Sequence, residues 1–160
     1  QFNSKHDVQF ANTVLEWFTK GGFDRLIIID GLVKPDKKGE QGDLFGVGSI
    51  STAREMLTKA GVEPIQQGVV AGICGYLLSE GERLGLDITA ILAECSPMYP
   101  DARAAALAIE AVSELIGIEI PLSSLIEDAR AIENSVQEIF ENAQNALPAP
   151  EDTSSDPSFG

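Results

Sequence analysis

The sequence predicts a three-layer α/β/α domain in which helices cover both faces of a sheet. Strand-like and helix-like patterns alternate along the chain, an order typical of this fold class. The run RLIII at residues 25–29 is almost entirely apolar and β-branched, as expected for a central, parallel strand covered on both faces. At 160 residues, the chain can bury one core. We therefore expect one α/β domain over residues 1–147, followed by a flexible, acidic, Pro/Ser-rich tail over residues 148–160.

The composition argues against several classes of partner. The 25 acidic and 11 basic residues give a formal net charge of -14, which repels phosphate backbones and anionic lipid. The apolar runs fall far below the roughly 20 residues that cross a bilayer. Cys74, Cys95 and the single histidine, His6, fit neither a disulfide framework nor a zinc site. We expect a cytoplasmic protein that binds no nucleic acid, membrane, metal or cofactor.

The first half of the chain should contain two helices and two strands. The capping-box spacing of Ser4 and Asp7 predicts a helix that begins there and runs to about Lys20. The run at residues 25–29 is the first strand, and a short second strand is expected at residues 44–50. Ser51 can then cap a helix that continues through Ala60.

The second half should alternate helix and strand again. We expect a helix over residues 76–84, a strand over residues 88–93, a helix from a cap at Asp101 to Ile116, and a final helix from Ser124 through Ala143. The glycine-rich segment at residues 68–75 predicts close packing of backbone against backbone, or, alternatively, a weak phosphate site. The residues expected to form the buried stripe of the Asp101 helix are Ala105, Ala108, Ile109, Val112, Leu115 and Ile116.

Acidic and nucleophilic side chains follow the strand at residues 88–93. Glu94, Cys95 and Ser96 stand at a strand's carboxyl end, where ligand crevices form in open α/β sheets. Asp30 ends the earlier strand, and Asp101 lies just beyond the turn. An Asp30 and Glu94 pair could perform acid–base chemistry, whereas carboxylates in such places more often cap helices or accept from loop N–H groups.

Two apolar features are candidates for binding a protein partner. Met98, Tyr99 and Pro100 form a stiff aromatic turn that loses little entropy on binding, although Tyr99 could equally cover the edge of the sheet. Phe159 is the one aromatic residue of the tail, and an exposed terminal anchor is one use for it. A residue without a role is the other interpretation of Phe159.

The run from residue 68 to residue 120 resembles the PAC2 family, the proteasome assembly chaperone group with archaeal members. The similar parts are the glycine-rich turn, a helix with Leu77, Leu78 and Glu80, and a strand that ends in Ala93 and Glu94. They continue with Tyr99-Pro100-Asp101, an alanine-rich helix, and the IGIEI link at residues 116–120. The resemblance extends over about residues 7–145.

This resemblance implies a phosphorylase/hydrolase-like fold and a chaperone that forms homo-oligomers and binds proteasome subunits or other assembly factors. Family members normally begin with a strand and a glycine-rich turn that have no counterpart here, so we expect the fold to lack its N-terminal strands. Ser158-Phe159-Gly160 departs at two positions from the hydrophobic-Tyr-any tripeptide with which some members dock. The alternative function is a small-molecule enzyme of the phosphorylase/hydrolase type that uses Asp30, Glu94 and Cys95.

Overall fold

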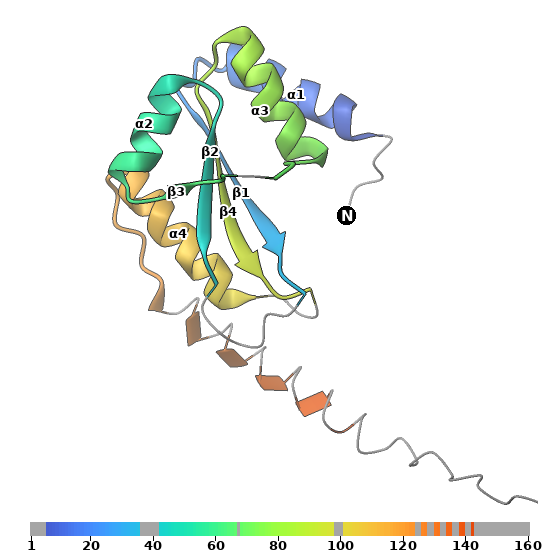
Figure 1. Cartoon of the computed structure of the whole chain (residues 1–160), viewed down its shortest axis with the longest axis vertical. Helices are drawn as coiled ribbons and strands as arrows, with labels where there is room; N and C mark the ends of the chain where they lie inside the picture. Colours follow the sequence, from blue (N-terminus) through green and yellow to red (C-terminus); the bar gives the residue numbers. More distant parts are fainter. Residues whose placement is uncertain are drawn as a thin grey trace, which may run out of the picture.

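A sheet of four strands lies between two layers of helices, which confirms the predicted α/β/α architecture (Figure 1). The computed structural model describes residues 6–35, 42–66, 68–97 and 101–123, together with scattered positions between 126 and 142. The helices are α1 (Asp7–Lys20), α2 (Ser51–Lys59), α3 (Gly72–Leu84) and α4 (Ala102–Ile116), and the strands are β1 (Leu26–Val33), β2 (Leu44–Gly48), β3 (Glu63–Pro64) and β4 (Ile88–Cys95).

The two helical layers divide the core into two clusters. Helices α1 and α3 pack on one face of the sheet, where Leu15 and Leu77 meet Ile88 and Leu92 of β4. Helices α2 and α4 pack on the other face, where Leu57 and Leu115 lie in a second cluster with Ile91 and Ala93. Successive side chains of β4 therefore serve opposite layers, as the period of two along a strand requires.

Strand β4, rather than β1, is the central strand of the sheet. The order is β1-β4-β2-β3, with β1 parallel and β2 antiparallel to β4. The first six residues of β4 are all buried, and Ile88 and Ile91 are fully enclosed. The apolar run that predicted a central strand at residues 25–29 therefore misplaced it.

Strand β1 runs parallel as predicted, but it lies at the edge. No described strand pairs with its outer side, and Ile29 and Val33 are 51% and 56% exposed. The predicted central position was wrong because an apolar run shows only that both faces of a strand are apolar. It does not show whether another element covers them.

Helix boundaries agree better with the sequence than helix caps do. Helix α1 ends at Lys20 as predicted, but its N-cap is His6, and α2 begins at Ser51 itself, with Ile50 as the N-cap. Neither N-cap makes a side-chain capping hydrogen bond in the described part of the chain. Ser51 therefore does not cap α2, contrary to expectation. Ser4, the predicted first cap, lies outside the described residues.

The buried stripe of α4 is rotated from the one that the sequence predicts. Ala108 and Leu115 are buried as expected, but Ala105 and Ile116 are exposed. The residues of α4 that are buried are Ala104, Ala106, Ala108, Ala111 and Leu115. Because most of these side chains are methyl groups, the axis of α4 can approach β4 closely, and the stripe falls on the small residues rather than on the large ones.

The glycine-rich segment packs backbone against backbone, as the simpler interpretation predicts. Helix α3 begins at Gly72, four residues earlier than expected. A side chain on Gly75 would place its Cβ 2.0 Å from the carbonyl oxygen of Val70. That contact requires glycine, so the structure accounts for Gly75 without a ligand.

The C-terminal predictions are tested only in part. The described residues between Ser123 and Asn142 are helical, in line with a final helix, and Ile139 on that helix is exposed. Most other residues of that predicted helix, and the tail from residue 148, lie outside the described residues. Among the described helices, none has the length and apolar character that a membrane span needs.

The start of β4 is fixed to the end of β2 by one buried hydroxyl group. Ser49 donates from Oγ to the carbonyl oxygen of Leu86 at 2.7 Å, and the same oxygen accepts from the N–H of Ile88 at 2.9 Å. Ser49 is 4% exposed, so water cannot replace either bond without a local opening of the fold.

We expect Ser49→Ala to lower the free energy of unfolding by about 1–3 kcal/mol, because it leaves a buried carbonyl and a buried N–H without partners. Ser51→Ala is the matched control, since Ser51 is exposed at the first turn of α2 and caps nothing. Its effect should stay within about 0.5 kcal/mol. Urea unfolding followed by circular dichroism measures the free energy of unfolding of both variants. Equal losses in the two variants would contradict the role assigned to the Ser49 hydroxyl group.

Candidate functional site

The predicted acidic pair at the strand ends does not form one site. In the parallel register, Asp30 of β1 stands beside Leu92, whereas Glu94 lies two residues further along β4. Asp30, Cys95 and Asp101 line a hollow of about 360 Å³ beside α4. Glu94 lines a different hollow, on the side of the sheet that α1 and α3 cover. Three of the four candidates thus line one hollow and Glu94 lines another. The side chain of Asp30 nevertheless lies on the α1/α3 face, as does its register partner Leu92, so it does not join Cys95 in one site.

Glu94 holds two loops at the end of β4. Its Oε2 atom accepts from Lys34 Nζ at 2.8 Å and from the backbone N–H of Asp43 at 3.1 Å. Lys34 follows β1 and Asp43 precedes β2, so one carboxylate joins both neighbours of β4. The side chain of Glu94 is only 11% exposed, which strengthens these bonds relative to a surface ion pair.

Asp101 is the predicted N-cap of α4. Its Oδ1 atom accepts from the N–H of Ala104 at 3.0 Å, and its Oδ2 atom accepts from the N–H of Ser96 at 3.1 Å. The carboxylate therefore satisfies an orphan donor of the helix and fixes the residue after β4. Both oxygens serve the backbone, which is a structural use of this acid.

Cys74 and Cys95 lie in unlike surroundings. Burial, aided by the negative charge of Asp30, raises the pKa of the Cys74 thiol from 9.0 to about 11, the opposite of activation. Asp30 itself accepts from the N–H of Gly31 at 2.8 Å. Cys95 is half-buried, and its Sγ atom packs so closely on Gly31 that a Cβ there would lie 2.7 Å away. The described residues hold no cluster of His, Cys, Asp and Glu suited to a metal ion.

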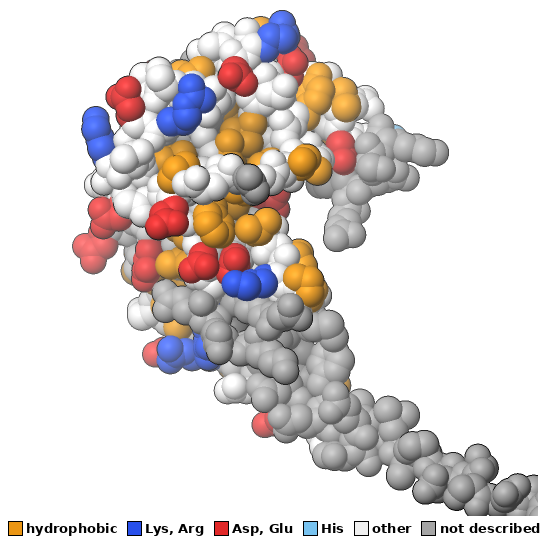
Figure 2. Space-filling view, viewed as in Figure 1, with side chains coloured by type: hydrophobic (Ala, Val, Ile, Leu, Met, Phe, Trp, Pro, Cys, Tyr) orange, Lys and Arg blue, Asp and Glu red, His pale blue; other side chains and the backbone are white. Residues whose placement is uncertain are grey.

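An apolar face of the sheet stays open beyond the ends of α1 and α3. It is lined by Leu32, Phe45, Ile65 and Val69, which we call the open sheet face, and it forms a hollow of about 490 Å³. Val69 is 91% exposed, and the Lys34–Glu94 ion pair borders the hollow. Figure 2 shows hydrophobic side chains in the centre of this view of the molecule. An apolar hollow with a charged rim is typical of a protein contact.

Sequence reasoning missed the open sheet face for two reasons. The strand at residues 25–29 was expected to stop before Leu32, although β1 continues to Val33. Val69 belongs to the glycine-rich segment, for which the sequence suggested backbone packing or a weak phosphate site rather than an apolar contact. The available signal was the apolar character of Leu32 and Val33 after Gly31, which continues the strand pattern. The predicted partner-binding residues, Met98, Tyr99, Pro100 and Phe159, lie outside the described residues.

The fold is that of an α/β/α protein whose strand-end acids bind its own backbone. Residues 3–140 match the model of the PAC2 family. The chain belongs to the PAC2 family, as the resemblance predicted. An uncharacterised protein of Methanocaldococcus jannaschii is 33% identical over 103 residues, which cover 64% of this chain and 43% of that protein.

Three similar crystal structures confirm the fold. Pyrococcus furiosus PbaA, an archaeal homolog of proteasome-assembly chaperone, gives a TM-score of 0.76 at 24% identity, over 91% of this chain and 64% of that chain. Pyrococcus furiosus PbaB, an archaeal proteasome activator, gives a TM-score of 0.73 at 23% identity, over 86% of this chain and 59% of that chain. A Mycobacterium tuberculosis proteasome-assembly chaperone homologue gives a TM-score of 0.63 at 17% identity, over 92% of this chain and 60% of that chain. The chain thus spans less than two thirds of the length of these relatives.

We expect Cys74 to resist alkylation in the folded protein. A pKa of about 11 instead of 9.0 lowers the thiolate fraction at pH 8 about 100-fold, and burial slows the reagent further. The rate of iodoacetamide labelling in the Cys95→Ala variant, which keeps only Cys74, should rise at least 100-fold in urea.

The Cys74→Ala variant, which keeps only the half-buried Cys95, serves as the comparison. Its labelling rate should rise less on unfolding in urea than that of the Cys95→Ala variant. Equal labelling of folded and unfolded Cys74 would show that the thiol is exposed and activated, against the structure. Labelling is read by mass spectrometry.

Proposed function

We propose that this chain acts as a proteasome assembly chaperone-like protein, which forms a homo-oligomeric scaffold and binds proteasome subunits or other assembly factors in the cytoplasm. Membership of the PAC2 family supports the proposal. So does the likeness in fold to PbaA and PbaB, which are described as a homolog of proteasome-assembly chaperone and as a proteasome activator.

The observation that carries the proposal is the open sheet face. An exposed apolar surface is costly in water and usually marks a contact with another macromolecule. Val69 stands almost free of its own chain, while Leu32 and Phe45 remain half-buried at the floor of the hollow. A partner's apolar side chains can fill this hollow without a rearrangement of the core, which suits a chaperone that binds and releases subunits.

Two further apolar patches, one on β1 and one on α1, support self-association. Ile29 and Val33 lie exposed on β1, whose outer edge pairs with no described strand. On α1, Phe10 and Trp17 are exposed one above the other at a spacing of seven residues, and Trp17 contacts Phe23 with ring centroids 4.5 Å apart. Unpaired edges of this kind are either covered in an assembly or protected by charge.

The turn and the tail extend the same proposal. Pro97 is exposed at the end of β4, and Met98, Tyr99 and Pro100 follow it directly. We propose that this turn and Phe159 also contribute to partner binding.

We expect Val69→Glu to weaken binding to purified proteasome α subunits at least tenfold, because it places a charge where an apolar contact is proposed. The side chain is so exposed that the fold should tolerate the change. Val33→Glu is the matched variant on the edge strand, and it should shift the mass in multi-angle light scattering towards the monomer while it leaves the α-subunit contact in place.

The two variants have separate readouts, so partner binding and self-association can fail independently. If the unmodified chain showed no affinity for α subunits or assembly factors, the proposed partner would be wrong. A strict monomer in light scattering would contradict the homo-oligomer.

Deletion of residues 148–160 tests the contribution of Phe159. We expect the truncated chain to keep its melting temperature and to lose about tenfold in affinity for the α subunits. The Phe159→Ala variant separates the aromatic ring from the charge of the tail, and unchanged affinity in both would remove the tail from the proposal.

A further inference from the structure

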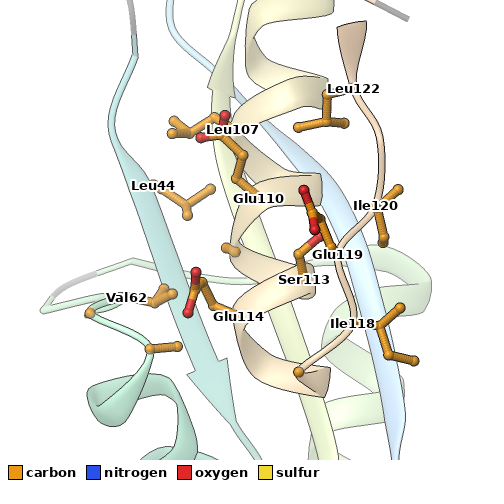
Figure 3. Close-up of a pocket in the computed structure, with 14 residues that line it drawn as sticks. Leu44, Val62, Leu107, Glu110, Ser113, Glu114, Ile118, Glu119, Ile120 and Leu122 are labelled. Carbon is orange, nitrogen blue, oxygen red and sulfur yellow. The ribbon is translucent and has the colours of Figure 1, made fainter.

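A second hollow lies on the opposite side of the sheet from the open sheet face. It has a volume of about 570 Å³, within the range of roughly 300–1,000 Å³ that is usual for ligand sites. Helix α4 forms its floor, and the start of β2, the turn after α2 and the segment after Gly117 form its walls (Figure 3). We call it the acidic groove and define it by Leu44, Val62, Leu107 and Leu122 with Glu114 and Glu119.

The apolar part of the acidic groove comes from separate elements. Val62 is buried, whereas Leu44, Leu107 and Leu122 are half-buried and present apolar surface to the hollow. In Figure 3, Leu44 points from β2 toward α4, and Leu122 points toward Leu107. An apolar hollow between rigid elements loses little entropy when a ligand fills it.

The acidic part lacks a counter-charge. No ion pair or hydrogen bond engages the carboxylate of Glu114 or Glu119 within the described part of the chain. Glu110 also lines the groove, but it borders a neighbouring hollow that Arg103 and Arg130 share. The uncompensated charge is therefore concentrated at Glu114 and Glu119.

A buried hydroxyl group in the groove also lacks a partner. Ser113 lies on α4 between the two kinds of lining, and its Oγ atom is buried without a hydrogen-bond partner among the described residues. Buried polar atoms in native proteins are nearly always satisfied, so an isolated one calls for an explanation. Because this atom is closed off from solvent, it does not contribute to the binding surface of the groove.

From these features, we propose that the acidic groove binds a cationic amphipathic segment of a partner protein, with apolar side chains on Leu44, Leu107 and Leu122 and Lys or Arg beside Glu114 and Glu119. Charge complementarity selects this occupant. A second copy of the chain is a poor match, because it carries 25 acidic residues against 11 basic ones.

This inference goes beyond the proposed function, because it concerns the other face of the sheet and states the chemistry of the bound segment. The inference concerns the acidic groove alone, so it does not depend on a proteasome partner at the open sheet face.

The test uses three fluorescein-labelled helical peptides of equal length and the full chain. The first presents leucines on one face flanked by lysines and arginines, the second carries glutamates in place of the cations, and the third carries serines in place of the leucines. We expect fluorescence anisotropy to show binding of the first peptide at least tenfold tighter than that of either other, with a further weakening as salt rises. Equal binding of all three peptides would overturn the proposal. A dissociation constant above about 1 mM for the first peptide would also overturn it.

Paired variants locate the contact. We expect Glu114→Gln with Glu119→Gln to weaken binding of the cationic peptide about tenfold. Glu55→Gln with Glu82→Gln removes the same charge from exposed positions on α2 and α3, and it should change the affinity less than twofold. Equal losses would show that only the net charge matters, and the proposal would fail.

Amide shifts separate this inference from the proposed function. Addition of the cationic peptide should move the backbone NMR signals of residues 107–122 and leave those of Leu32 and Val69 in place. Shifts confined to the open sheet face would overturn the acidic groove and leave the chaperone proposal standing. The Val69→Glu variant should bind this peptide as the unmodified chain does, so loss of α-subunit binding in that variant concerns the proposed function alone.

Discussion

The structure depends on the burial of β4 between two strands and two helical layers. Six consecutive residues of this strand are buried, and its side chains belong to both core clusters. Burial of a large aliphatic side chain contributes roughly 1.5–3 kcal/mol, so Ile88, Ile91 and Leu92 are among the largest single contributions to stability. Ser49 fixes where this strand begins, and Glu94 and Asp101 fix the backbone where it ends.

The position of β4 leaves the domain asymmetric. On one side of it, β2 and β3 continue the sheet, whereas on the other side β1 is the last described strand. Helices α1 and α3 pack against the sheet without covering Leu32 and Phe45 completely. Apolar surface therefore remains at the outer edge of β1, which pairs with no described strand, and on the open sheet face, while the acids at the end of β4 are bonded to the backbone. This arrangement suits protein contacts better than acid–base chemistry.

The charge of the chain is distributed unevenly with respect to these surfaces. The open sheet face has a paired border, since Lys34 neutralises Glu94 there. Across the sheet, Glu114 and Glu119 have no such partner in the described part of the chain. Charge complementarity contributes more to the rate and specificity of association than to its affinity, and the two faces differ in this property.

The sequence by itself determined the fold class, most helix boundaries, the cap at Asp101 and the family, because these follow from local periodicity, capping chemistry and motif order. One of the two interpretations of the glycine-rich segment, close backbone packing, fits the position of Gly75. Only the tertiary structure decided that β4 is central and β1 is an edge, which face of α4 is buried, and that Asp30 and Glu94 line separate hollows. Neighbours distant in the chain set these properties, and an apolar run such as residues 25–29 does not reveal which neighbours it has.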